Sequence, residues 1–301
     1  MIHYYAECVY VRRLPLVYYT MPLMARKKYE MHKKIIRFLS FLLPRLVSSL
    51  AYRTLMNPQV RKLRKHELDF LAQAEKRIIK HRGLDIQTYR WGNALDEKIL
   101  LIHGWEGQAG NFTDVVQKLL ESQYYILAFD APSHGFSSKS KTSLFEFGDF
   151  VEYIIKDFNC KKLISHSMGG VMTTYALFKN QDLRIDKYVL LTTPDKFTEK
   201  ISLLINDLGI SKKVETLLIN KIESEMEVNV RELNVSNFVK NINVKKALII
   251  HDKNDQVIPI SQPRNVNANW KESQLIEIEG TGHFRILRTE EVIKSVVEFL
   301  K

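Results

Sequence analysis

Cysteine is scarce in this sequence, and no spacing suggests that the cysteines pair. Of 301 residues, only Cys8 and Cys160 are cysteines. A chain of this length can bury a large apolar core without a disulfide framework. So few cysteines are typical of a reducing compartment, and we expect a cytoplasmic protein. We interpret Cys160, just before an apolar strand, as a small packed side chain.

Long apolar runs, ligand clusters and phosphate-binding loops are also missing. No stretch has about 20 nearly uncharged apolar residues, the length of a membrane-spanning helix. The nine histidines are scattered, so we expect no metal site. No glycine-rich loop follows a strand, which argues against a nucleotide-binding fold. We therefore expect neither a metal nor a cofactor.

Positive charge is concentrated in the first third of the chain. Residues 1–91 contain 19 Lys or Arg and 6 Asp or Glu, a net charge of +13, whereas the remainder contains 26 and 28, a net charge of −2. The basic character therefore belongs to an N-terminal region and not to the main body. This argues against a nucleic-acid partner and allows an extension that contacts something acidic.

Residues 1–82 are predicted to form a basic, helical N-terminal extension. Residues 33–55 are apolar but are interrupted by Arg37, Pro44 and Arg45, as in an amphipathic helix. Three interpretations remain open: packing on the main domain, peripheral contact with a membrane, or disorder. Residues 58–83 also have helical spacing, and Gly83 is a natural helix stop.

From residue 84 onward, short apolar strands alternate with helical segments. Most strands are continuous apolar runs, which is typical of parallel strands buried on both faces. We expect an α/β fold over residues 83–301: a mostly parallel, twisted sheet with helices on both faces. The predicted strands are residues 84–92, 98–104, 124–130, 161–167, 187–194, 246–252 and 274–280.

Residues 197–244 interrupt this alternation with helical segments and no strand. We predict a small helical lid over the carboxyl ends of the strands, inserted before the strand at residues 246–252. The alternative is a surface insertion that gates nothing.

The carboxyl ends of three predicted strands carry a possible nucleophile, acid and base. Ser167 follows one strand, Asp255 a later one and His283 the last. Sites in parallel sheets form at these ends. A serine hydroxyl keeps its proton at neutral pH, so it needs a base such as histidine, oriented by a carboxylate. The alternatives are a corner serine and a loop histidine without chemistry.

Short motifs around these residues agree with one family. They are "HGW" at residues 103–105, "DAPSHGFS" at 130–137, "SHSMGG" at 165–170, "DKNDQVIP" at 252–259 and "GTGH" at 280–283. Over about residues 84–301 the sequence resembles the α/β-hydrolases of the serine esterase and lipase type. The resemblance implies Ser167 as nucleophile, His283 as base and Asp255 as acid. It also implies an oxyanion hole formed by the backbone N–H groups of Trp105 and Met168.

The sequence around Ser167 departs from the G-x-S-x-G pattern of that family. Ser165 stands in place of the first glycine, while Gly169 is present. At such an elbow the strand and the helix pass very close, so small residues are needed on both sides of the nucleophile. We expect Ser165 to be tolerated, with its hydroxyl bonded to a backbone carbonyl.

Other polar residues near the strand ends have simpler explanations. Asp252 and Asp195 are the rivals of Asp255 for the acid. We expect His103 and His134 to brace their loops, and His166 to point away from the site. Asp130 is interpreted as a turn cap, His251 as a core histidine and Arg285 as a solvated or paired residue.

These residues predict a serine hydrolase that cleaves a carboxylic ester or thioester through an acyl-enzyme, with a lysophospholipase-like substrate as one option. A serine nucleophile argues against dehalogenase and epoxide hydrolase chemistry, which need a carboxylate. The alternatives are a non-catalytic binding protein of the same fold, and a cofactor-free haloperoxidase or C–C hydrolase. The expected partners are a small ester or acyl substrate and, through the extension, a membrane surface.

Overall fold

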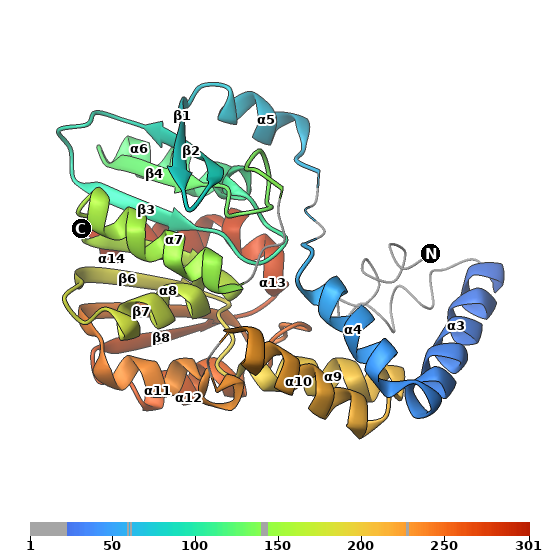
Figure 1. Ribbon diagram of the computed structural model, residues 1–301. Coiled ribbons are helices and arrows are strands. Elements are labelled where there is room, and N and C mark those ends of the chain that lie inside the picture. The colour runs from blue at the N-terminus through green and yellow to red at the C-terminus, as the bar shows by residue number, and fades with distance from the viewer. Residues whose placement is uncertain (1–22, 59, 61, 140–143, 227–228) are drawn as a thin grey trace. The chain divides into compact units, whose positions relative to one another are not determined.

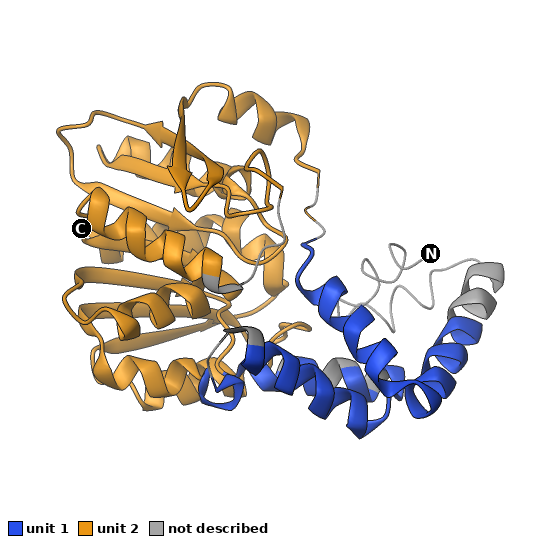
Figure 2. Cartoon of the chain, in the orientation of Figure 1, with its two compact units in different colours: residues 1–59, 196–233 blue, residues 60–195, 234–301 orange. Residues whose placement is uncertain are grey.

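In the computed structural model, residues 23–58, 60, 62–139, 144–226 and 229–301 are described. The chain divides into two compact units, which Figure 2 distinguishes by colour. Unit 1 comprises residues 1–59 and 196–233, and unit 2 comprises residues 60–195 and 234–301. Cys8 lies outside the described residues, and Cys160 is buried in unit 2 with a free thiol.

Unit 2 is built on a sheet of eight strands among its described residues (Figure 1). The order across the sheet is β1-β2-β4-β3-β5-β6-β7-β8. Strands β3 to β8 pair with one another in parallel, whereas the β1–β2 and β2–β4 pairs are antiparallel. The strands are β1 (Glu75–His81), β2 (Leu84–Trp91), β3 (Lys98–Ile102), β4 (Tyr125–Phe129), β5 (Lys162–His166), β6 (Arg184–Leu191), β7 (Asn243–Asp252) and β8 (Ser273–Ile278).

Helices cover both faces of this sheet, as predicted. Figure 1 shows α7 (Leu144–Asp157) and α8 (Met168–Lys179) in front of it and α14 (Glu290–Leu300) behind it. One core joins α14 and α6 (Thr113–Glu121) to alternate strand residues such as Ile99 and Leu101, while Leu100 between them is equally buried. Burial on both faces explains the continuous apolar strands. The remaining helical pieces of unit 2 are α5 (Lys65–Leu71), η1 (Ala109–Phe112), α11 (Val235–Phe238), η3 (Val239–Asn241), α12 (Ser261–Ala268), α13 (Gly282–Arg285) and η4 (Ile286–Arg288).

The helical interpretation of residues 58–83 is confirmed only for α5 and is wrong for the rest of its described residues. The helix α5 ends at Leu71, and residues 75–81 form strand β1. Arg82 and Gly83 both have positive φ, which makes the two-residue turn of a hairpin in which His81 pairs with Leu84. Gly83 therefore ends a strand and not a helix. Pairing with β2 outweighs the local helical spacing, because the paired backbone groups satisfy one another.

Unit 1 combines the N-terminal helices with the helices of the insertion. It contains α3 (Leu23–Leu42), α4 (Pro44–Leu55), α9 (Phe197–Leu208), α10 (Lys212–Met226) and the 3₁₀ turn η2 (Val230–Glu232). The predicted helix over residues 33–55 is present, divided at Leu43 because Pro44 cannot donate a backbone hydrogen bond.

The helices of unit 1 contact one another through specific side chains. At the start of α10, the Ser211 amide donates to the Ser40 hydroxyl at 3.0 Å, and the Ser211 hydroxyl donates to the Ser40 carbonyl at 2.8 Å. Farther along, the Lys221 ammonium lies 4.8 Å from the centre of the Tyr52 ring. The extension therefore packs on the inserted helices.

We predicted a domain boundary after residue 82, and this boundary stays a prediction. In the structure, α5 and β1 belong to the same compact unit as the sheet. The insertion predicted at residues 197–244 is helical as far as η3, but β7 begins at Asn243, three residues before the predicted strand; the last helical part, α11 and η3, lies in unit 2. Its role as a lid stays a prediction.

Candidate active site

Ser167 occupies the sharp turn between strand β5 and helix α8. Its φ of 52° and ψ of −125° fall in a region that non-glycine residues rarely adopt. The Ser167 amide donates to the Leu191 carbonyl at 2.8 Å, which fixes the turn against the end of β6. Strained backbone of this kind persists only where the surroundings determine it, and it clusters at functional sites.

The residues on either side of Ser167 show why the turn needs small side chains. A Cβ added to Gly169 would lie 2.3 Å from the His103 carbonyl oxygen and 2.7 Å from that of Ile102, at the end of β3. On the strand side, the fully buried Ser165 donates to the Tyr188 hydroxyl at 3.0 Å and approaches the Val189 carbonyl oxygen at 3.4 Å. The expected carbonyl contact is therefore present, and the Tyr188 hydroxyl is the shorter one.

Ser167, His283 and Asp255 form a continuous hydrogen-bonded chain. The distance from His283 Nε2 to Ser167 Oγ is 2.9 Å, and that from His283 Nδ1 to Asp255 Oδ2 is 2.8 Å. An ionised carboxylate can only accept, so Nδ1 carries the proton and Nε2 is left to accept from the serine. All three residues are buried, between 5% and 8% exposed. The structure brings together the three residues that the sequence singled out.

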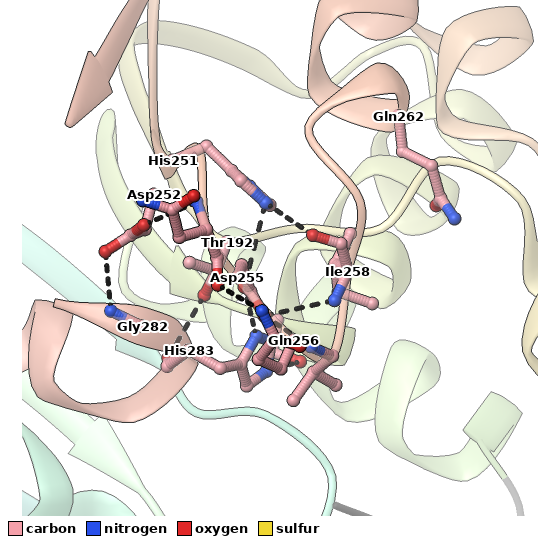
Figure 3. A network of polar contacts seen from close by, with 12 residues as sticks. Thr192, His251, Asp252, Asp255, Gln256, Ile258, Gln262, Gly282 and His283 are labelled. Carbon is pink, nitrogen blue, oxygen red and sulfur yellow. Dashed lines mark hydrogen bonds and ion pairs between the residues drawn. The ribbon is translucent and has the colours of Figure 1, made fainter. Parts of the chain in front are cut away.

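The Asp255 carboxylate is held by the turn that follows β7 (Figure 3). Its Oδ1 accepts from the amides of Val257 at 2.6 Å and Ile258 at 3.1 Å. Burial acts to raise the pKa of Asp255, but the hydrogen bond and charge of His283 and the two amide donors outweigh it and lower this pKa below its ordinary value. Asp255 is therefore held ionised and pointed at His283.

The two rival aspartates have other partners. Asp252 accepts from the amides of Thr281 and Gly282, the latter at 2.6 Å, so it fixes the loop that carries His283. Asp195 accepts from the Ser236 amide at 2.8 Å and from Asn265 Nδ2 at 2.6 Å. Neither carboxylate has a hydrogen bond to His283 in the described part of the chain.

The expectation that His166 points away from the site is wrong. Its Nε2 donates to the main-chain carbonyl of His283 at 2.9 Å, and the two rings are 5.1 Å apart. Thr192 Oγ1 reaches the same carbonyl at 3.4 Å. Burial lowers the pKa of His166 to about 3, and the nearby His283 acts in the same direction. A neutral His166 therefore helps to hold the backbone of His283.

His251 is a second buried histidine beside the acid. Its Nε2 donates to the Ile258 carbonyl at 2.9 Å and lies 3.6 Å from Asp255 Oδ2 (Figure 3). Burial is the largest influence on its pKa, which is lowered. The interpretation as a core histidine with a satisfied nitrogen is confirmed for Nε2, whereas Nδ1 is buried without a partner among the described residues.

The predicted oxyanion-hole donors lie on two backbone segments next to Ser167. Met168 is the first residue of α8, so its N–H has no acceptor within the helix and lies at the positive end of the helix dipole. A Cβ added to Gly104 would lie 3.0 Å from Ser167 Cβ, which places the segment preceding Trp105 against the nucleophile. The Trp105 amide donates to none of the described residues, and its indole packs edge-on against His134 at 4.9 Å.

The loops around this site are fixed by buried polar side chains, as predicted. His103 Nε2 accepts from the Ala131 amide at 2.9 Å, and His134 Nε2 accepts from the Glu106 amide at 3.1 Å. Asp130 accepts from the amides of Ala109 and Phe136. Burial lowers the pKa of His134 to about 4 and that of His103 well below its usual value. These histidines are neutral braces.

Arg285 also has a local role, since it donates to the carbonyls of Gly280 and Thr281 and thereby braces the loop that carries His283. We predicted that Arg285 is either solvated or paired. It forms no ion pair with another described residue.

This chain matches one known protein family in sequence. The family model of the alpha/beta hydrolase fold matches residues 98–219. The protein belongs to the α/β-hydrolase fold. The matched segment includes Trp105 and Ser167 but ends before Asp255 and His283.

Relatives by sequence carry hydrolase names. A Drosophila melanogaster protein named as a probable serine hydrolase is 36% identical over 95 residues, which cover 29% of this chain and 28% of the relative. A Bacillus subtilis protein named as an uncharacterized hydrolase is 24% identical over 263 residues, which cover 73% of this chain and 95% of the relative. This chain thus spans little more than a quarter of the first relative.

Solved structures share the fold at low sequence identity. An esterase from Exiguobacterium antarcticum has a TM-score of 0.61 and 18% identity, and the match covers 75% of this chain and 99% of the esterase. A membrane phospholipase A has a TM-score of 0.58 and 16% identity, and the match covers 92% of this chain and 96% of that one. At these identities the likeness concerns the fold.

Proposed function

We propose that this α/β-hydrolase is a serine hydrolase that cleaves a carboxylic ester or thioester through an acyl-enzyme. The observation that carries the proposal is the chain from Ser167 Oγ through the His283 imidazole to Asp255, with contacts of 2.9 and 2.8 Å. The relative named as a probable serine hydrolase supports it.

In the first half of the reaction, Ser167 Oγ attacks the acyl carbon while His283 Nε2 accepts its proton. The ionised Asp255 stabilises the resulting imidazolium and keeps Nδ1 as the donor. His283 then gives the proton to the leaving alcohol or thiol as its bond to the acyl carbon breaks. The acyl group remains on Ser167.

In the second half, water attacks the acyl carbon while His283 accepts its proton, and His283 then returns the proton to Ser167 Oγ as the bond between Oγ and the acyl carbon breaks and the carboxylic acid is released. Both halves pass through a tetrahedral oxyanion, which the N–H groups of Met168 and Trp105 stabilise. Removing one such donor typically costs about 10²–10³ in rate. Both donors are backbone groups, one at the first residue of α8 and one in the turn that follows β3.

A lysophospholipase-like substrate is the finer part of the proposal. One similar structure is named an esterase and the other a membrane phospholipase A, and both names are consistent with an ester substrate. The match to the phospholipase covers 92% of this chain, so it includes much of the N-terminal extension. We therefore expect an apolar acyl group in the substrate.

A chain-length series of p-nitrophenyl esters tests this function. Wild type should hydrolyse them, with a preference for longer acyl chains, and Ser167→Ala should lose activity by several orders of magnitude. Ser165→Ala is the matched control, because it removes a neighbouring hydroxyl that bonds to Tyr188. Equal activity of wild type and Ser167→Ala would contradict the proposal, and a preference for short chains would remove its finer part.

A further inference from the structure

Large apolar side chains are exposed on one short segment of unit 1. Of the thirteen large apolar side chains that are exposed among the described residues, eight lie within residues 31–50. The eight, which we call the exposed apolar face, are Met31, Ile35, Phe38, Phe41, Leu42, Leu43, Leu46 and Leu50. Single exposed apolar residues are ordinary, whereas a contiguous group of this size marks an interaction surface.

On α3 these side chains share one side of the helix. Met31, Ile35, Phe38 and Leu42 are spaced by four, three and four residues, which places them along one stripe. Phe38 is 64% exposed. Ser40, on the opposite side, is fully buried and holds Ser211 at the start of α10. The helix therefore packs through the side that carries Ser40 and leaves the stripe from Met31 to Leu42 exposed.

The second helix continues this arrangement. Leu43, Leu46 and Leu50 are spaced by three and four residues along the start of α4, and all are exposed. Val47, four residues after Leu43, borders the same stripe and is buried, as is Ser48. The exposed apolar face thus runs across the break at Pro44 from one helix to the next.

The segment that carries the exposed apolar face is strongly basic. Residues 23–58 contain eight Lys or Arg and a single acidic residue, a net charge of +7. Lys34, Arg37, Arg45 and Arg53 are exposed. None of these four side chains forms an ion pair with another residue in the described ranges. Cations on the same helices as exposed apolar side chains suit a surface that offers both anionic groups and hydrocarbon.

We propose that the exposed apolar face binds the surface of an anionic phospholipid bilayer. Helices α3 and α4 lie in the plane of the interface, with their phenylalanines and leucines among the acyl chains and their cations at the phosphates. Within the described residues no helix is long and apolar enough to cross a membrane. The binding is therefore peripheral.

A second copy of the chain fits this face less well than a bilayer does. In a two-fold dimer the same patch meets itself, so two segments with a net charge of +7 each would be brought together. Like charges at an interface oppose association. An anionic bilayer instead attracts the same charges and accepts the apolar side chains.

The inference does not depend on the proposed hydrolase activity, since it uses only residues of unit 1. Co-flotation of the full chain with phosphatidylcholine vesicles, with and without phosphatidylglycerol, measures it. Wild type should float with the anionic vesicles, more weakly as salt rises. Ser167→Ala should float equally well, which separates this test from that of the catalytic serine.

Two variants separate the apolar contribution from the charged one. Phe38→Gln/Phe41→Gln should weaken binding at least tenfold, because two aromatic side chains no longer enter the hydrocarbon. Leu95→Gln is the matched control, since Leu95 is 92% exposed in unit 2, and it should bind as wild type does.

Arg45→Gln/Arg53→Gln should weaken binding to the anionic vesicles about fivefold for each charge and leave phosphatidylcholine vesicles unaffected. The control Lys240→Gln/Lys271→Gln removes two exposed charges from unit 2 and should change nothing.

The proposal is overturned if wild type does not float, or if both unit 1 variants float as well as their controls. It is also overturned if analytical ultracentrifugation shows a dimer that Phe38→Gln/Phe41→Gln dissociates while no vesicles bind, since the face would then join two copies.

Discussion

The imidazole of His166 donates a hydrogen bond to the main-chain carbonyl of His283 at 2.9 Å. It joins the residue before the candidate nucleophile to the backbone of the candidate base. The position of His283 therefore depends on the end of β5 as well as on its own loop.

Removing this contact should slow the reaction without changing its pH profile. We expect His166→Ala to lower kcat about tenfold, because the lost hydrogen bond to a buried carbonyl leaves His283 less well placed. His166 is neutral over the working range, so its loss shifts no titration. Steady-state kinetics across pH check this, with Thr192→Val as the control for a longer contact to the same carbonyl. A shifted pH profile would mean that His166 itself titrates in the reaction.

The assignment of the acid predicts a large difference between two asparagine variants. Asp255→Asn should lower kcat by about 10⁴, because an asparagine can donate to Nδ1 and so favours the wrong tautomer of His283. Asp195→Asn should keep kcat within a few-fold and cost about 1 kcal/mol of stability, since its carboxylate holds the Ser236 amide and Asn265. Ester hydrolysis and urea unfolding measure the two effects, and the opposite pattern would move the acid to the end of β6.

The crowding at the elbow predicts which substitutions it accepts. Ser165→Gly should keep most of the activity, because only the bond to Tyr188 is lost. Ser165→Val should lower activity strongly, because it removes that bond and adds a methyl group in a fully buried position. Activity and thermal unfolding of both variants test this order.

On the helix side of the elbow, Gly169→Ala should destabilise the protein by about 3 kcal/mol or more, since its Cβ meets backbone oxygen of β3. A Gly169→Ala protein with wild-type stability would contradict the close approach.

Buried neutral histidines should make the protein less stable in mild acid. Burial holds the pKa of His134 at about 4, below the value of 6.5 for an unfolded histidine. Between these values the unfolded chain binds a proton that the folded chain does not. The contribution of His134 to the free energy of unfolding is therefore fully present above pH 6.5. It falls by about 1.4 kcal/mol per pH unit as the pH drops toward 4.

Urea unfolding at several pH values between 5 and 7 measures this slope. His134→Gln should reduce it by one proton's contribution. An unaltered slope in His134→Gln would show that this side chain is not buried in its neutral form.

The site could be predicted from sequence because its chemistry follows local patterns. Ser167, Asp255 and His283 each follow an apolar strand directly or within a few residues, and parallel strands bring their carboxyl ends to one edge. The contact between His166 and His283 could not be predicted in this way, because it joins residues 117 positions apart and depends on how the last loop returns to β5.

Two features of the fold also could not be predicted from local sequence patterns. Residues 75–81 have helical spacing but form β1, because an adjacent strand offers them hydrogen-bond partners. The packing of α4 against α10 joins Tyr52 to Lys221, and neither segment shows by itself that it has such a partner. Both features depend on contacts between segments that form only when the chain folds, so the sequence of either segment alone does not predict them.

Labelling with a fluorophosphonate probe, followed by mass-spectrometric mapping, tests the central claim most directly. Such a probe reacts with an activated serine and leaves ordinary hydroxyls unmodified. The account predicts one modified residue, Ser167, with labelling abolished in Ser167→Ala and in His283→Ala. Modification at another serine, or undiminished labelling of Ser167→Ala, would contradict it.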